Sequence, residues 1–201
     1  IDDDILRKSK ELGMDWQELG QKETNQLLTD LKGLNAVPFD HFVAATQHIN
    51  EVIGLVEVLM DKGFAYAVNG SVYFSVAKAK DFGKLSHLDP NEMLPIANER
   101  GNNPNDPNKQ DPIDFVLWQA AKPGEPTWET PWGPGRPGWH IECTAMAQKY
   151  LGEKFAIHGG GYDLIFPHHE CEIAQAENAT DEEPYVRYWM HAAMVNYQGE
   201  K

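Results

Sequence analysis

The sequence predicts an α/β fold that contains part of a parallel β-sheet and an inserted region. Helical and strand patterns alternate from Ile141 onward, and such β–turn–α–β alternation is typical of a parallel sheet. Between about residues 49 and 130, a hairpin pattern and long loops interrupt the alternation, which indicates an insertion. At 201 residues, the chain is long enough for one sizeable core, or for one domain with a second inserted into it.

The N-terminal part of the chain has helical patterns. Apolar residues recur at three- and four-residue steps over residues 2–32 and again over residues 42–59, which predicts amphipathic helices. Pro38 separates the two patterns, and Lys62-Gly63 supplies the stop signal of the second.

The middle of the chain predicts a hairpin followed by loops. Residues 64–68 and 72–76 flank Asn69-Gly70-Ser71, a sequence typical of a tight β-turn. Residues 98–112 are rich in Asn, Pro and Asp and predict an exposed loop. Residues 114–118 are largely apolar and predict a buried strand or a short helix.

The C-terminal third predicts the parallel sheet itself. A stretch rich in Pro and Gly precedes a series of elements: a helix over 141–151, a strand over 155–157, a turn at Gly159-Gly160-Gly161, a helix over about 167–178 and a strand over 188–195. Antiparallel strands within residues 155–195 would contradict this interpretation.

The amino-acid composition argues against several classes of protein: membrane-spanning, mainly nucleic-acid-binding and disulfide-rich. The chain is 41% apolar and 24% charged, which is ordinary for a globular protein, and it contains no run of about 18 apolar residues. A formal net charge of −14 argues against a main electrostatic surface for nucleic acid, because phosphate contacts need clustered Lys and Arg. Two cysteines, Cys143 and Cys171, are too few for a disulfide framework, so we expect a reduced, cytoplasmic setting.

The sharpest local signal is Phe166-Pro167-His168-His169-Glu170-Cys171-Glu172. Pro167 suits the first turn of a helix, on which His168 and Glu172 would lie four residues apart on one face. A histidine and a carboxylate in this arrangement can bind zinc, while His169 and Cys171 would point elsewhere. An i,i+4 pair alone is more often a polar helix face than a metal site.

Two further stretches strengthen the case for a binding site. Cys143 begins a predicted apolar helix after several constraining Gly and Pro residues. A lone cysteine is usually a small buried apolar residue, but together with His168 and Glu172 it would make a third zinc ligand. The glycines at 159–161 follow a predicted strand, so the backbone can approach a ligand closely, and Asp163 can accept hydrogen bonds. A tight loop without a ligand explains the glycines equally well.

The chain closely resembles the cysteinyl-tRNA synthetases at residues 133–143, at 158–161 with 163–164, and at 166–170 with 172–175, and weaker matches extend over nearly the whole chain. In that family a class I Rossmann catalytic domain activates cysteine with ATP and Mg²⁺ and passes it to tRNA(Cys). The resemblance implies three regions: helices from the first half of the catalytic domain (1–48), an inserted connective region (49–130) and the second half of the Rossmann domain (131–201).

The resemblance also implies a zinc site. It assigns zinc ligands to Cys143, His168 and Glu172, and the zinc of that family binds the thiolate of the substrate and so selects cysteine over serine. The family's fourth ligand and its phosphate-binding His-x-Gly-His motif precede Ile1, and Lys201 matches the first lysine of its Lys-Met-Ser-Lys-Ser loop. We therefore expect an internal part of the catalytic region that does not activate cysteine by itself.

Substrate binding is assigned by the same resemblance to Trp139, His158, Gly160 and Asp163, and no catalytic residue is assigned within the chain. The expected partners are cysteine, ATP and tRNA(Cys), with the tRNA bound mainly through regions outside these residues. We expect a monomer that does not contact a membrane. Cys171 stands where many relatives carry Asn.

Three alternatives stay open. A sister family joins cysteine to glucosaminyl-inositol in mycothiol synthesis; it is expected to replace the glutamate ligand with an apolar or small residue, so Glu172 favours the tRNA enzyme. A zinc hydrolase based on His168-His169-Glu170 lacks the His-Glu-x-x-His spacing that places two histidines on one face. The last alternative is an α/β domain with a purely structural zinc.

Overall fold

The computed structural model describes residues 3–195, and the chain divides into two compact units, residues 1–47 and 48–201. The first unit contains helices α1 (Asp3–Leu12) and α2 (Trp16–Gly33) and a short 3-10 turn, η1 (Ala45–Gln47). Gly13, with a positive φ of 64°, ends the first helix, and Asp15 caps the second by accepting hydrogen bonds from its first turn. Leu6 and Leu19 are buried where the two helices pack. The helical pattern over residues 2–32 thus folds as a helical hairpin.

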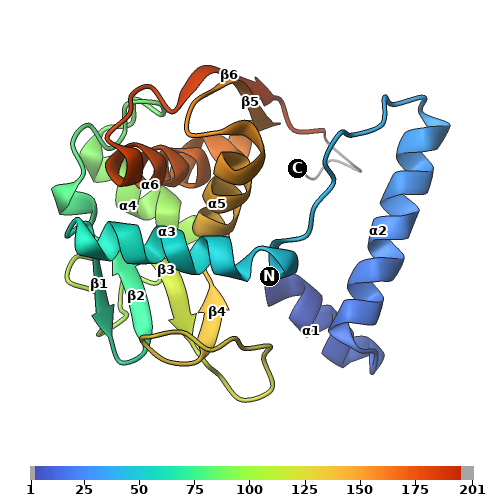
Figure 1. Cartoon of the computed structure of the whole chain (residues 1–201), viewed down its shortest axis with the longest axis horizontal. Coiled ribbons are helices and arrows are strands. Elements are labelled where there is room, and N and C mark those ends of the chain that lie inside the picture. The colour runs from blue at the N-terminus through green and yellow to red at the C-terminus, as the bar shows by residue number, and fades with distance from the viewer. Residues whose placement is uncertain (1–2, 196–201) are drawn as a thin grey trace. The chain divides into compact units, whose positions relative to one another are not determined.

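The second unit contains two small sheets and four α-helices within its described residues (Figure 1). The helices are α3 (Ile49–Asp61), α4 (Pro90–Glu99), α5 (Trp139–Leu151) and α6 (Glu170–Thr180). The strands are β1 (Ala65–Val68), β2 (Ser71–Phe74), β3 (Phe115–Ala120), β4 (Gly135–Pro137), β5 (Phe155–Gly161) and β6 (Val186–Ala192). Shorter turns are η2 (Val76–Lys78), η3 (Tyr162–Leu164) and η4 (Ile165–His169).

The first sheet is antiparallel and has the order β1-β2-β3-β4. Its first two strands form the predicted hairpin, in which Val68 pairs with Ser71 across Asn69 and Gly70. Both turn residues have a positive φ, as the favoured two-residue hairpin turn requires.

The second sheet is parallel and pairs β5 with β6, from Phe155↔Val186 to Gly161↔Ala192. The predicted parallel pairing of the C-terminal strands is confirmed, and the described fold is a mixed α/β arrangement with one parallel and one antiparallel sheet. Helix α6 supplies the crossover that joins the two parallel strands, which is the β–α–β unit expected from the sequence.

The main core of the second unit lies between the antiparallel sheet and helices α3, α5 and α6, which pack together beside it (Figure 1). Val52, Val56 and Leu59 of α3 are fully buried there, as are Phe74 and Trp118 of the sheet. Helix α3 belongs to the predicted insertion and α5 and α6 to the region after it, yet they share this core. The boundaries at residues 48/49 and 130/131 stay predictions.

The structure differs from the predicted elements at several places. The second N-terminal helical pattern becomes a regular helix only at Ile49, after η1 and the N-cap residue His48. Gly159-Gly160-Gly161, predicted as a turn, continues strand β5, because these residues pair with β6 up to Ala192. Helix α4 was not predicted at all, although Asp89 and Glu92 form a capping box around its start.

Helix α6 also begins later than predicted. Phe166 is extended (φ −140°, ψ 135°), because the residue before a proline disfavours the helical region, and the chain then turns irregularly through Pro167 and His168. The regular helix starts at Glu170. No helix among residues 3–195 is long and apolar enough to cross a membrane.

Candidate metal centre

Helices α5 and α6 and the turn before α6 bring together three potential metal ligands. Cys143 lies in the second turn of α5, His168 in the irregular turn η4, and Glu172 in the first turn of α6. One donor atom from each of these side chains lies within 4.8 Å of the others. Their assignment as zinc ligands stays a prediction, but the structure does bring the three side chains together.

Glu172 is the centre of this arrangement. Its side chain is 0% exposed, and Nε2 of His168 lies 2.8 Å from its Oε1. Among residues 3–195, no donor makes a hydrogen bond to either of its carboxylate oxygens. A buried carboxylate without hydrogen bonds is costly unless a cation balances it, so this residue fits a metal ligand.

Cys143 has the electrostatic surroundings of a thiol that needs a cation to ionise. Burial, with a further contribution from the Glu172 and Glu142 carboxylates, raises the pKa of the Cys143 thiol well above its ordinary value. A divalent cation reverses this preference, because a coordinating thiol is deprotonated outright. The set of one sulfur, one nitrogen and one carboxylate oxygen matches the ligands that zinc takes in proteins.

His168 is held on its outer side by two aromatic neighbours. Its Nδ1 lies 2.8 Å from Nδ1 of His140 in a hydrogen bond, and its ring stacks on Trp139 with 4.1 Å between the centroids. Burial, then the neighbouring His168, lowers the pKa of His140 to about 3, so His140 stays neutral near pH 7. When Nδ1 of His168 carries the proton, its Nε2 lone pair faces Glu172, which is the usual orientation of a metal-binding histidine.

A second group of potential ligands shares Glu172. His158 and His169 each offer a ring nitrogen within 4.8 Å of the other and of a Glu172 oxygen, and Nε2 of His158 lies 3.5 Å from Oε2. The expectation that His169 points away from the ligand pair is therefore wrong. Because the turn before α6 is irregular, His168 and His169 can both approach the same carboxylate. His169 is also hydrogen-bonded to Nε2 of His191 at 2.8 Å.

The predicted substrate-binding residues lie around these groups. Trp139 is 55% exposed and stacks on His168. His158 faces Glu172, and Gly160 lies against His169, since a Cβ at this glycine would be 2.7 Å from the His169 ring. Asp163 lies in η3, where its carboxylate folds back over the adjacent Gly161, and no described contact joins it to the ligand group.

Cys171 lies off the ligand groups. It is 1% exposed and packs in the main core, and burial raises the pKa of its thiol well above the ordinary value. This placement agrees with the expectation that Cys171 points away from the His168–Glu172 pair.

Two residues to which the sequence analysis assigned no supporting role, Arg100 and Glu170, hold the ligand segment from outside. Arg100, at the end of α4, donates hydrogen bonds to the main-chain oxygens of Asp163 and Phe166. Glu170 is 1% exposed and accepts hydrogen bonds from the main-chain N–H groups of Leu85 and Ser86. Helix α4 was not predicted, so the sequence analysis did not point to Arg100. Glu170 was considered only as part of the zinc-hydrolase alternative, not as a residue that holds the ligand segment.

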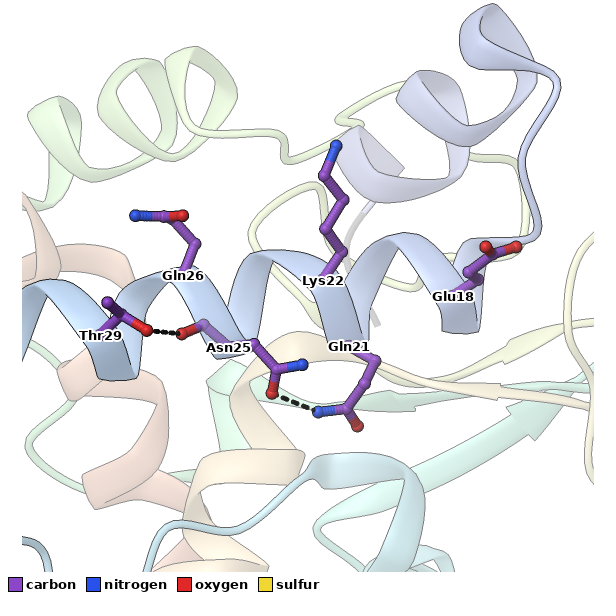
Figure 2. Close-up of a pocket in the computed structure, with 6 residues that line it drawn as sticks. All are labelled: Glu18, Gln21, Lys22, Asn25, Gln26 and Thr29. Carbon is purple, nitrogen blue, oxygen red and sulfur yellow. Dashed lines mark hydrogen bonds between the residues drawn. The ribbon is translucent and has the colours of Figure 1, made fainter.

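A separate shallow hollow lies on helix α2 in the first unit. Figure 2 shows its lining side chains, which project from the helix, and their mutual contacts: Gln21 donates to the Asn25 side chain and Thr29 to the Asn25 main-chain oxygen. These are the i,i+4 contacts of an exposed polar helix face and give no reason to place a site there.

All 201 residues match the family of tRNA synthetases class I (C) catalytic domains, which defines the class of protein to which the fold belongs. The chain belongs to this family, as the sequence motifs predicted. It is 52% identical over 202 residues to the cysteine–tRNA ligase of Thermococcus onnurineus and 50% identical over 201 residues to that of Pelotomaculum thermopropionicum.

Another relative carries a different name. The chain is 45% identical over 201 residues to the L-cysteine:1D-myo-inositol 2-amino-2-deoxy-alpha-D-glucopyranoside ligase of Parafrankia sp.. Each of these three alignments covers 100% of this chain but only 40–45% of the relative. The chain thus spans about two fifths of the length of the curated relatives it matches.

Proposed function

We propose that this chain is part of an enzyme that activates cysteine with ATP and transfers it to tRNA(Cys). The observation that carries the proposal is the convergence of Cys143, His168 and Glu172 within 4.8 Å, in a chain whose similar relatives are named cysteine–tRNA ligases. Such a ligand group suits an enzyme that must recognise a thiol.

We propose Cys143, His168 and Glu172 as ligands of zinc. When bound, zinc supplies a Lewis acid that prefers a thiolate to an alcohol and so selects cysteine over serine. The buried Glu172 carboxylate without hydrogen bonds and the ring of His168, oriented by His140, support this assignment. Packing alone would discriminate weakly, because the two substrates differ little in size.

The remaining predicted residues fit the walls of a cysteine pocket. Trp139 offers an exposed indole face beside His168, which suits contact with a small substrate. Gly160 keeps the strand close to His169, while His158 faces Glu172. We propose that these three residues line the pocket and that Asp163, at its edge, binds the substrate ammonium group.

The second candidate is a ligase that joins cysteine to an amino sugar, which the Parafrankia relative supports. The two candidates share cysteine activation and differ in the acceptor. Glu172 favours the tRNA enzyme, because the sister family is expected to replace this residue.

The test uses the protein at its full natural length. ATP–pyrophosphate exchange should depend on cysteine and strongly reject serine, and [³⁵S]cysteine should appear on tRNA(Cys) but not on glucosaminyl-inositol. Transfer to the amino sugar alone would overturn the tRNA proposal. The absence of any cysteine-dependent exchange would overturn cysteine activation.

A further inference from the structure

Glu170 makes contacts that its position between two proposed metal ligands does not by itself require. Its carboxylate accepts hydrogen bonds from the Ser86 N–H at 2.9 Å and the Leu85 N–H at 3.1 Å, both on Oε2. The side chain is 1% exposed, so the negative charge is buried and balanced by main-chain dipoles. It therefore ties the first residue of α6 to a loop more than 80 residues earlier in the chain.

The segment that carries His168 needs such a tie, because it is not held by regular helix hydrogen bonds. Phe166 is extended and the chain turns irregularly until Glu170, where α6 begins. The helix itself fixes Glu172. Arg100 holds this segment on the Phe166 side, and the position of His168 relative to Glu172 depends in addition on how the start of α6 is anchored.

The loop that Glu170 holds is itself braced. Gly83 has a φ of 105° and packs so closely on Met93 of α4 that a Cβ there would clash with the methionine side chain. Phe82 contacts the ring of Phe166 edge-on, with 6.1 Å between the centroids. The loop and α4 thus form a fixed support behind the segment that carries His168.

We infer that Glu170 is a positioning residue for the metal centre: by accepting the Leu85 and Ser86 N–H groups, it fixes the start of α6 so that His168 and Glu172 face one another. This inference rests on the proposed function, since it takes these residues as zinc ligands. Glu170 belongs to neither group of potential ligands, so in this inference it acts only through the backbone that carries them.

The same loop has a second attachment that serves as a matched control. Lys84 forms an ion pair with Glu177, two helical turns beyond Glu170 on α6 and on the far side of Glu172. Lys84→Ala weakens the attachment of the same loop to the same helix but leaves the start of α6 tied by Glu170. A residue that only stabilises the loop and a residue that positions the ligands can therefore be told apart.

The experiment measures zinc affinity by competition with a chromophoric chelator, along with thermal stability and the cysteine KM, in the full-length protein and its variants. Glu170→Ala should weaken zinc binding about tenfold or more, as does the loss of other groups that orient ligands. Its cysteine KM should rise, and added zinc should restore exchange activity. The zinc affinity of Glu170→Gln should lie between those of Glu170→Ala and wild type, because the amide oxygen still accepts one N–H. If Glu170→Ala does not fold, Glu170→Gln provides the test.

Lys84→Ala should lower the melting temperature while zinc affinity stays within about twofold of wild type, since the ligands keep their orientation. Wild-type zinc affinity in both Glu170 variants would overturn the inference and leave the proposed function intact. Equal loss of zinc in Lys84→Ala would also overturn it, because loop attachment in general would then be the cause. A wild-type protein that binds no zinc would overturn the proposed zinc site, and the inference with it.

Discussion

His168 Nε2 lies 2.8 Å from Glu172 Oε1, at contact distance but without the alignment of a hydrogen bond. Two groups with lone pairs approach so closely in a buried site when a proton or a cation lies between them. The nearby thiol of Cys143 adds a third donor. This geometry leads to the first two predictions, which concern the metal.

Cys143→Ser should abolish stoichiometric zinc binding in the full-length protein, because an alcohol is a poor substitute for a thiolate on zinc. Zinc content is measured by elemental analysis after gel filtration. The matched control is Cys171→Ala: this cysteine lies in the core, so the variant should lose about 1 kcal/mol of stability but keep its zinc. Full zinc in Cys143→Ser would contradict the ligand assignment.

Glu172→Gln should weaken zinc binding by about ten- to a hundredfold rather than abolish it. The amide oxygen can still coordinate but carries no charge to balance the metal. Titration with a competing chelator gives the affinity, which should fall between those of wild type and Cys143→Ser. An unchanged affinity would mean that the buried carboxylate has another purpose.

From the sequence, the grouping of Cys143, His168 and Glu172 was predicted more accurately than the backbone conformation around them. His168 and Glu172 stood out by their four-residue spacing and Cys143 by the Gly and Pro residues before it, and the family resemblance assigned all three as zinc ligands. The spacing argument assumed a regular helix from Pro167, whereas Phe166 is extended and α6 begins at Glu170. His168 and Glu172 still come together, because the irregular turn η4 takes the place of one helical turn. The hydrophobic periodicity of the sequence gives no sign of this turn.

Contacts between distant segments could not be predicted. The hairpin at Asn69-Gly70 follows from local turn chemistry, and so does the capping box of α4, which was overlooked. The hydrogen bonds from Leu85 and Ser86 to Glu170 join residues far apart in the chain. Their existence depends on the packed fold and leaves no local pattern.

Gly160→Ala should destabilise the protein by about 2 kcal/mol, because overpacking a filled site costs this much. The added Cβ would lie 2.7 Å from Cε1 of His169, whose ring is held by His191. Gly159→Ala is the control on the same strand: its Cβ would lie 3.7 Å from the Met190 oxygen, an ordinary contact. Urea unfolding measures both variants, and equal stability of the two would contradict the close approach.

Asp114→Ala should cost about 3 kcal/mol, since it leaves several partly buried donors without their acceptor. Asp114 is 0% exposed and accepts hydrogen bonds from the Tyr66 hydroxyl at 2.7 Å and the Val76 N–H at 2.9 Å. The less buried Asp106 accepts from the Tyr73 hydroxyl at 2.7 Å, so Asp106→Ala should cost only about 1 kcal/mol. Urea unfolding measures both losses of stability. A larger loss in Asp106→Ala than in Asp114→Ala would contradict the role of the Asp114 hydrogen bonds.

The last prediction concerns pH in the zinc-free protein. Burial is the main cause that raises the pKa values of both Cys143 and Cys171 above that of a free thiol. As pH rises above about 8.5, the unfolded chain releases thiol protons that the folded protein retains, so the folded state loses relative stability. Between about pH 8.5 and pH 10, each thiol should lower the free energy of unfolding by at most about 1.4 kcal/mol per pH unit. Above about pH 10, tyrosines also begin to titrate. Urea unfolding of the chelator-treated protein between pH 8 and 10 should show this slope, and Cys171→Ala should reduce it. A free energy of unfolding that stays constant over this range would show that the thiols ionise as readily in the folded protein as in the unfolded chain.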